Sequence, residues 1–244
     1  MTAAGFLAGT GLLALLIVLS ARRYLGESAA RIALAGLGSW LVYVGTLSAL
    51  GIFSNPVLRP PGVLYMAVPA IAFVALFAVR SKRAGAVARA LPIGLLMGGQ
   101  VFRVGVEVGL HQLWEKGLVP QLMTYEGGNV DIFIGLSAPL VAWLTGSGKV
   151  SWRAGIAWNV LGLLALANII VRSALTAPGP LNFMHSEVPN MAIGTFPYTF
   201  VAGFFAPLAV MLHVLSIRHL RTQPAAQEPM FAGIGPFGHP RSPE

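Results

Sequence analysis

Charged residues divide this chain into apolar stretches about as long as a membrane-spanning helix, and this spacing constrains the fold most strongly. A helix needs about 20 mostly apolar residues to cross a bilayer. Only 10% of the 244 residues are Asp, Glu, Lys or Arg, whereas a typical soluble domain carries about 25%. The mean hydropathy is +0.74. These values exclude an ordinary soluble globule and a largely disordered chain. They predict an all-α, polytopic integral membrane protein.

Seven transmembrane helices are predicted, near residues 3–21, 32–53, 63–79, 90–112, 130–146, 154–174 and 196–217. The first range is interpreted as a span and not as a signal peptide, because no basic residue precedes it and Arg22 and Arg23 follow it. Residues 1–221 are thus expected to form one seven-helix transmembrane domain. The Pro-, Gly- and Ala-rich residues 222–244 are predicted to be a disordered cytoplasmic tail.

The basic residues predict the orientation of the helices. If the N-terminus lies outside, 12 of the 16 Lys and Arg residues fall in cytoplasmic segments, as the positive-inside rule requires. The prediction is therefore a multi-pass protein of the bacterial cytoplasmic (inner) membrane, with its C-terminus inside. Its first partner is the lipid bilayer. The net charge of +8 is explained by topology, so no nucleic-acid partner is predicted.

Acidic residues are distributed in the opposite way, and topology does not require that. In this orientation only three are cytoplasmic, whereas five fall on the outer side or in the outer half of a helix: Glu107, Glu115, Glu126, Asp131 and Glu187. Because Asp and Glu contribute little to orientation, their positions indicate a polar site near the outer surface.

The fourth predicted helix carries the strongest signal for such a site. At about 100° per residue, Gln100, Arg103, Glu107 and His111 fall on one face. Arg103 and Glu107, and Glu107 and His111, are i,i+4 pairs that can touch. The prediction is that Glu107 compensates the charge of Arg103. A purely structural Arg–Glu pair is the alternative, but ionisable residues inside membranes commonly mark functional sites.

Other polar residues are expected at the same outer side. The segment before the fifth helix carries Glu126, Asn129 and Asp131, where Asn129 or Asp131 can also cap that helix. The sixth helix ends with Asn168 and Arg172 on one face. Arg172 either extends to the interface or binds an anionic group. The connection 174–197 carries His185 and is long enough to cover a binding site.

The motifs exclude several chemistries. The chain has no Cys, which removes thiolate metal sites, disulfides and a Cys nucleophile. Glu107 and His111 do not match the spacings of zinc-protease or di-iron motifs, so no metal is assigned. The cofactor stays unknown. His213 and His219 are interpreted as interfacial residues, and most of the cytoplasmic helix halves are apolar, with Asn159 as the main exception. This pattern describes an outward-facing pocket with a closed floor.

The leading functional hypothesis is a membrane-embedded enzyme that performs acid–base chemistry on a lipid-like or small anionic substrate. Its catalytic residues would be Glu107, His111, Arg103 and Asp131, and its substrate-binding residues Gln100, Glu126, Asn129, Asn168, Arg172 and His185. One alternative is a proton- or ion-coupled transporter of small solutes. The other is a non-enzymatic sensor or assembly subunit. The sequence fixes neither the substrate nor the oligomeric state.

Overall fold

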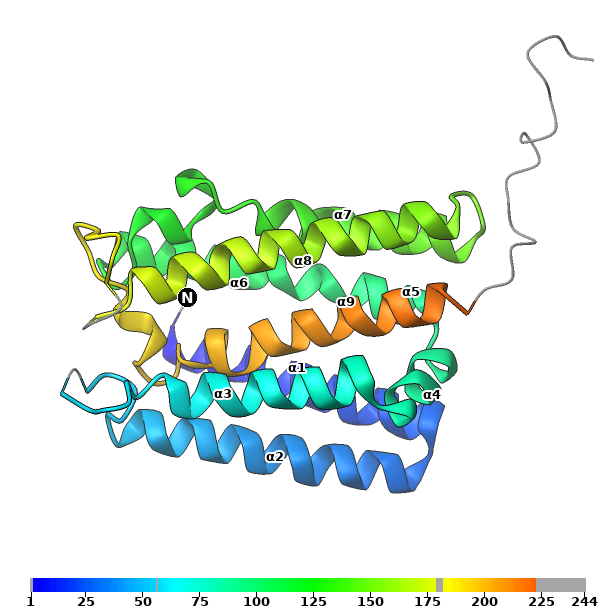
Figure 1. The fold of residues 1–244 in the computed structure, drawn as a ribbon, viewed down its shortest axis with the longest axis horizontal. Coiled ribbons are helices and arrows are strands. Elements are labelled where there is room, and N and C mark those ends of the chain that lie inside the picture. Colours follow the sequence, from blue (N-terminus) through cyan, green and yellow to red (C-terminus); the bar gives the residue numbers. More distant parts are fainter. Residues whose placement is uncertain (1, 56, 179–181, 223–244) are drawn as a thin grey trace, which may run out of the picture.

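The chain folds as a bundle of antiparallel helices that run along the long axis of the molecule (Figure 1). The structure is a computed structural model and describes residues 2–55, 57–178 and 182–222. All regular secondary structure in these ranges is helical. The predicted disordered tail lies outside the described residues from position 223 onward.

The elements follow the apolar ranges closely. The longest helices are α1 (Ala3–Leu25), α2 (Glu27–Ala49) and α8 (Trp152–Leu175). Two further long helices change their winding along their length: α5 (Ile93–Gly98), η2 (Gly99–Val101) and α6 (Phe102–Glu115) are continuous, as are η6 (Val201–Phe205) and α9 (Ala206–Leu220). Completing the bundle are α3 (Leu64–Phe73), which continues as η1 (Val74–Arg80), α4 (Lys82–Ala90) and α7 (Asp131–Gly146).

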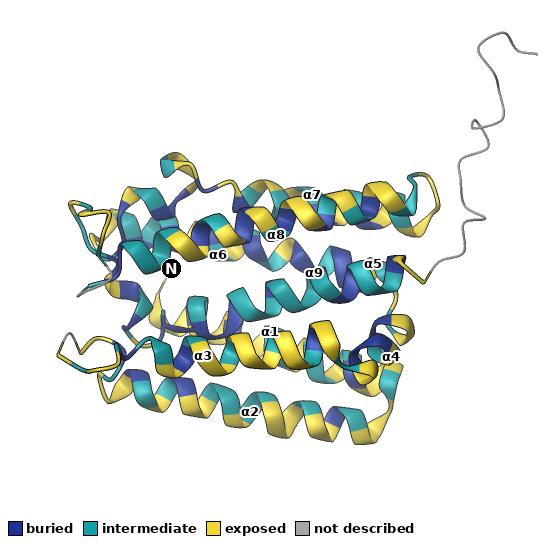
Figure 2. Ribbon diagram, in the orientation of Figure 1, coloured by how far each residue is buried: buried dark blue, intermediate teal, exposed yellow. Residues whose placement is uncertain are grey.

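Five of the helices in the described ranges are long and apolar enough to cross a membrane, and the count rises to six if α3–η1 and α4 form one bent span. The remaining apolar helix, α7, is shorter. The outward side chains agree with a lipid environment, since large apolar residues such as Leu12, Ile32, Ile71 and Leu161 are exposed along the helices (Figure 2). The fold is therefore that of a helical, multi-pass membrane protein.

The bundle has two chemically distinct ends. The turns at one end, here called the basic end, comprise the α1–α2 turn, α4, the α7–α8 turn and the C-terminal end of α9; they carry Arg22, Arg23, Lys82, Arg83, Arg89, Lys149 and Arg221. The opposite end, here called the loop end, holds the described residues of the connections 50–63, 116–130 and 176–200.

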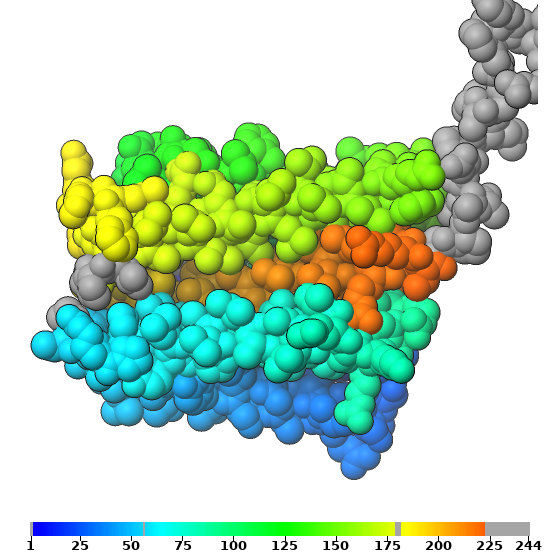
Figure 3. All heavy atoms as spheres, in the orientation of Figure 1, coloured from blue at the N-terminus to red at the C-terminus, as the bar shows by residue number. Residues whose placement is uncertain are grey.

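Helix α9 lies between the two halves of the bundle, with α1–α3 on one side and α5–α8 on the other (Figures 1 and 3). It packs against α8, α5, α4 and η1. On the α1–α3 side the core is aromatic and aliphatic, built from Phe6, Val44, Met66, Phe200 and Phe204. On the other side α9 meets buried polar groups, so this half contains the candidate site.

Helix α4 was not among the predicted elements, which leave residues 80–89 between two spans. It is bent by 73° from α3–η1 and covers the basic end. Its buried residues are Ala84, Gly85 and Ala88, but Lys82, Arg83 and Arg89 make the helix polar on average, and its 9 residues are too few to cross a bilayer alone. Ser81 caps the helix by accepting a hydrogen bond from the Ala84 N–H at 3.1 Å.

Candidate functional site

The candidate site is centred on the buried face of α6 and its continuation through η2. Gln100, Arg103 and Glu107 are 0%, 2% and 1% exposed, so the one-face arrangement expected from helical periodicity places three polar side chains inside the bundle. His111 lies on the same face, one turn closer to the loop end, and is only partly buried. The polar face therefore runs from the interior towards the loop end.

Arg103 forms a two-point ion pair with Asp131, the first residue of α7. Its Nε lies 2.7 Å from Oδ2, and its Nη2 contacts Oδ1 of the same carboxylate. The prediction that Glu107 compensates Arg103 is therefore wrong. The two helices approach closely at Gly135, where a Cβ would stand 2.9 Å from the backbone N of Val104 and 3.3 Å from the Cβ of Arg103. This approach brings the guanidinium to α7 and away from its own helix.

Glu107 is instead held by Asn129. The Asn129 side-chain amide donates to Glu107 Oε1 at 2.7 Å and to the Met123 carbonyl at 3.2 Å, while its Oδ1 accepts from the Asp131 N–H at 3.1 Å. Asn129 thus satisfies the N–H group of the first residue of α7 from the position before the N-cap, Val130. The second carboxyl oxygen of Glu107, Oε2, is buried and has no hydrogen-bond partner among the described residues. Glu107 also lies within electrostatic reach of Asp131 and Arg103.

The network extends from Arg103 across α9 to α8. Arg103 Nη1 lies 2.8 Å from His213 Nε2, and His213 Nδ1 lies 2.8 Å from Asn159 Oδ1. Because a guanidinium can only donate, Nε2 accepts, and the His213 proton must reside on Nδ1 and point to Asn159. Asn159 in turn donates to the Gly155 carbonyl at 2.8 Å. The interpretation of His213 as interfacial is wrong, since its side chain is fully buried.

Two signals for His213 were available in the sequence. One is Asn159, which is the main polar exception among the apolar helix halves. The other is Gly162 on α8, where a Cβ would overlap the His213 ring. Neither signal identifies a partner, because the contact joins α8 and α9 across 54 residues of chain. Gln100 adds a further link to α9 by donating to the Ala209 carbonyl at 3.0 Å.

We call Glu107, Asn129, Asp131, Arg103, His213 and Asn159 the buried network. It connects α6, α7, α8 and α9, and each member is 5% exposed or less. Gly135 and Gly162 are the positions where small residues allow these helices to approach. Small residues at helix contacts and hydrogen bonds between helices are the usual means of association in lipid.

A second polar group surrounds His111 near the loop end. Its ring stacks on Tyr125, with ring centres 5.0 Å apart, and lies 5.2 Å from the ring of Trp114. Its two nitrogens lie 3.8 Å from a Glu115 oxygen and 3.9 Å from a Glu126 oxygen. Glu126 therefore approaches His111, as expected, but it makes no hydrogen bond to a member of the buried network among the described residues.

Arg172 positions the segment that supplies Asn129 and Asp131. From α8, its Nη1 donates to the carbonyls of Leu122 at 3.2 Å and Gly127 at 2.6 Å, and its Nε donates to Asn168 at 3.0 Å. Arg172, oriented by Asn168, thus holds the connection between α6 and α7 against the end of α8. His185 is exposed on the 182–190 segment, and none of the hydrogen bonds of the buried network involves it.

The described residues contain no group of three or more His, Asp or Glu side chains that could hold a metal ion. Two surface grooves lie away from the network. One is at the junction of η1 and α4, and the other lies between α5 and α7, with Gly98, Ala142 and Trp143 among its lining residues. The arrangement places several ionisable side chains inside the bundle with little exposure.

Fold and site together define a helical multi-pass membrane protein with a buried ionisable network. The chain belongs to the family described as Domain of unknown function (DUF8737), whose model matches residues 60–221. No curated protein and no solved structure matches the chain. The matched range contains every residue of the buried network and excludes α1 and α2.

Proposed function

We propose that this protein crosses the bacterial inner membrane seven times, with its N-terminus outside and its C-terminus in the cytoplasm. The seven spans would be the five long apolar helices, the bent α3–η1 segment and the shorter α7. The concentration of Lys and Arg at the basic end supports this orientation by the positive-inside rule. The loop end, with Glu115, Glu126 and His111, would then face outward.

We further propose that the buried network exchanges protons, and that Glu107 is the group that gains and loses the proton. The observation that carries this proposal is the buried Oε2 atom of Glu107, which has no protein partner, whereas both oxygens of Asp131 are occupied by Arg103. Ionisable groups in membrane interiors are costly and commonly form proton relays or substrate paths. Of the two buried carboxyl groups, Glu107 alone has an oxygen available for a proton or a ligand.

A proton-coupled transporter of a small solute is the function that the geometry favours. The mostly apolar cytoplasmic halves of the predicted helices argue against a transport path. In the structure, however, the buried network continues past Arg103 to His213 and Asn159. Asn159 lies seven residues from the first residue of α8, which begins at the basic end. The polar chain therefore extends from the outer half of the bundle into the half nearer the basic end. Such depth is expected of a transport path and exceeds what an outward-facing catalytic pocket needs.

Liposomes containing the purified protein and a trapped pH-sensitive dye test this proposal. A panel of acetate, lactate, succinate and inorganic phosphate is added outside, and solute-dependent proton uptake is measured. We expect uptake with at least one anion, and a decrease of about 100-fold or more in Glu107→Gln, as for loss of an essential acid–base group. Glu115→Gln is the matched control and should keep the wild-type rate. Proton movement equal to that of protein-free liposomes for every anion would overturn the proposal.

A membrane enzyme acting on a lipid-like substrate is the second candidate, and the surroundings of His111 favour it. This side chain is partly accessible and lies near two carboxylates, which is the setting of a general acid or base. The products are sought by mass spectrometry of the liposome lipids after incubation with the wild type and with His111→Gln. Lipid conversion that His111→Gln abolishes would establish the enzyme.

A structural or sensory role makes a different prediction. If the network only holds the bundle together, Glu107→Gln should lower the melting temperature and the yield of folded protein to the same extent as it lowers activity. If Glu107 exchanges protons, the variant should melt close to the wild type, because Asn129 can still hydrogen bond to a neutral amide oxygen.

A further inference from the structure

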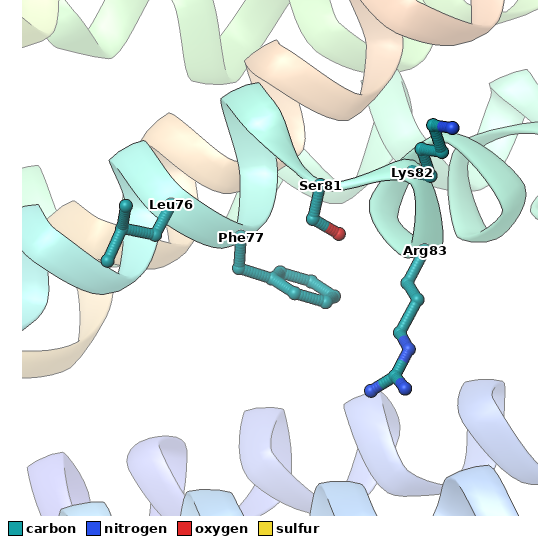
Figure 4. A pocket seen from close by; sticks show the side chains of 5 residues that line it. All are labelled: Leu76, Phe77, Ser81, Lys82 and Arg83. Carbon is teal, nitrogen blue, oxygen red and sulfur yellow. The ribbon is translucent and has the colours of Figure 1, made fainter.

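A groove of about 480 Å³ lies where η1 meets α4, at the basic end and outside the buried network. Leu76, Phe77, Ser81, Lys82 and Arg83 line it. In Figure 4 the Arg83 side chain points towards the α1–α2 hairpin, Phe77 and Ser81 lie on the same side of the bend between η1 and α4, here called the elbow, and Lys82 points away from the hairpin. The groove therefore combines an apolar wall on η1 with a polar, cationic wall at the start of α4.

Hydrogen bonds from α9 hold the elbow. Arg218 of α9 donates to the carbonyls of Ala78, Val79 and Ser81 at 2.7–2.9 Å. Gly85 makes room for this side chain, since a Cβ there would stand 2.7 Å from Arg218 Nη2. Arg218 thus satisfies the carbonyl groups freed by the bend, and the positions of Lys82 and Arg83 are fixed by α4 and do not depend on a flexible loop.

The two cations of the groove have no acidic counterpart. Lys82 and Arg83 are exposed, and neither forms an ion pair with another described residue. The one acidic side chain among the described residues of the basic end, Glu27, is paired with Arg22 at 2.9 Å. An anion that reaches the groove would therefore meet uncompensated positive charge.

The apolar wall distinguishes this groove from an ordinary cluster of surface lysines. Leu76 is 63% exposed, and Phe77 stacks with Phe73 along η1 at 5.3 Å between ring centres. These side chains lie on a helix that is apolar enough to be in the membrane. In the proposed topology, the cations next to them would lie at the level of the phosphate groups of the inner leaflet. A ligand that fits both walls must be amphipathic and anionic.

We propose that the groove binds an anionic phospholipid, with the phosphate of the headgroup at Ser81, Lys82 and Arg83 and one acyl chain along Leu76 and Phe77. Basic pockets between membrane helices commonly select such lipids, and each Lys or Arg near the surface strengthens their binding. Ser81 supplies a hydroxyl, and its side chain is half-buried at the bend. The bound lipid would fill the space between the elbow and the α1–α2 hairpin.

Lipid retention by the purified, detergent-solubilised protein tests this proposal. The protein is mixed with equal amounts of phosphatidylglycerol and phosphatidylcholine of the same chain length, and retained lipid is counted by native mass spectrometry. We expect the wild type to retain phosphatidylglycerol preferentially. Lys82→Gln/Arg83→Gln should bind it about 30-fold more weakly, from two lost charges. Lys149→Gln/Arg221→Gln removes two exposed charges from the same end and should keep the wild-type preference.

The remaining outcomes are also decisive. Equal losses in the two double variants would show attraction by the general surface charge and would overturn a specific groove. Preference retained in Lys82→Gln/Arg83→Gln would overturn it as well. Glycerol 3-phosphate at millimolar concentration should not compete, because it lacks the acyl chain; if it does compete, the site binds free phosphate groups. Leu76→Asn keeps both charges and should weaken retention through the apolar wall alone, which keeps the test valid if the double variant folds poorly.

Discussion

The α1–α2 hairpin and the α3–α9 bundle differ in what holds them together. About a tenth of the apolar window of each hairpin helix is buried (11%), whereas 39% is buried for α5–α6 and for η6–α9. The hairpin contacts the bundle through aromatic rings, such as Phe6 against Tyr198 and Phe205. The bundle contains the whole buried network. The family model begins at residue 60, so it contains the whole buried network and does not contain the hairpin.

The residues that pack the hairpin and the residues of the buried network thus lie in separate parts of the chain. Apolar surfaces gain little from meeting each other in lipid, so the hairpin depends on close packing and a few hydrogen bonds. One of these runs from Trp40 Nε1 to the Gly203 carbonyl at 2.6 Å. The bundle contains ionisable groups whose loss leaves an uncompensated buried charge. Substitutions in the two regions should therefore differ strongly in their effects on stability.

The largest effect is expected for Asp131→Ala, which leaves the guanidinium of Arg103 buried without its carboxylate. Breaking a buried ion pair in this way costs about 3–5 kcal/mol. Unfolding by sodium dodecyl sulfate in mixed micelles measures it. Arg103→Ala/Asp131→Ala should be less destabilised than the sum of the two single variants. Strict additivity would show that the pair does not hold α6 to α7.

Gly162→Ala should have the next largest effect. The added methyl group would overlap the His213 ring, which must then leave Arg103 and Asn159. Overpacking of this kind costs about 1–3 kcal/mol, and the same unfolding titration reports it. Gly105→Ala is the matched control, because a Cβ there meets nothing within 4 Å. Equal stability of the two variants would contradict the placement of His213 against α8.

Arg172→Met should act locally. It removes the donors to the Leu122 and Gly127 carbonyls, and each hydrogen bond from a charged group contributes about 1.5–3 kcal/mol at most, less where the groups are partly exposed. We expect faster hydrogen exchange in residues 121–130 and unchanged exchange in α1 and α2. Lys116→Met, which removes a cation from the same connection, should leave exchange in 121–130 unaltered. Faster exchange throughout the chain would argue against a local effect.

The smallest effect is expected in the hairpin, for Trp40→Phe. It removes the hydrogen bond to Gly203 while keeping an aromatic ring, and such bonds average about 0.6 kcal/mol in membrane proteins. Proton uptake in liposomes should match the wild type, since the buried network is untouched. If uptake fell as far as in Glu107→Gln, the separation between hairpin and bundle would be wrong.

The helices could be predicted from the sequence because the signal is local. Each predicted range overlaps a helical segment, although α2 begins and ends earlier than the range 32–53 and the last helix begins at Val201 and not at 196. The period of 3.6 placed Gln100, Arg103 and Glu107 on one face. The same reasoning missed α4, because this helix has only 9 residues and three of them, Lys82, Arg83 and Arg89, are charged. The number of crossings and their orientation are predicted by apolar length and charge bias, and they stay predictions.

The partners within the site could not be predicted in the same way. Whether Arg103 pairs with Glu107 or Asp131 depends on how closely α7 approaches α6 at Gly135, which no periodicity encodes. His213 and Asn159 are single polar residues in apolar helices, and only the packing of α8 on α9 brings them together. Glu126, His111 and Arg172 do lie near the loop end as expected, but each makes contacts other than those the substrate-binding hypothesis gave it.

The pairing of Arg103 with Asp131 has a consequence for the electric charge of the bundle interior. The charges of these two side chains cancel. His213 is neutral, because its Nε2 accepts a hydrogen bond from Arg103 and therefore carries no proton. If Glu107 exchanges protons as proposed, the net charge of the buried network alternates between zero and minus one. A membrane potential exerts about 2.3 kcal/mol on each elementary charge moved across 100 mV. Voltage and pH would then act on the same atom.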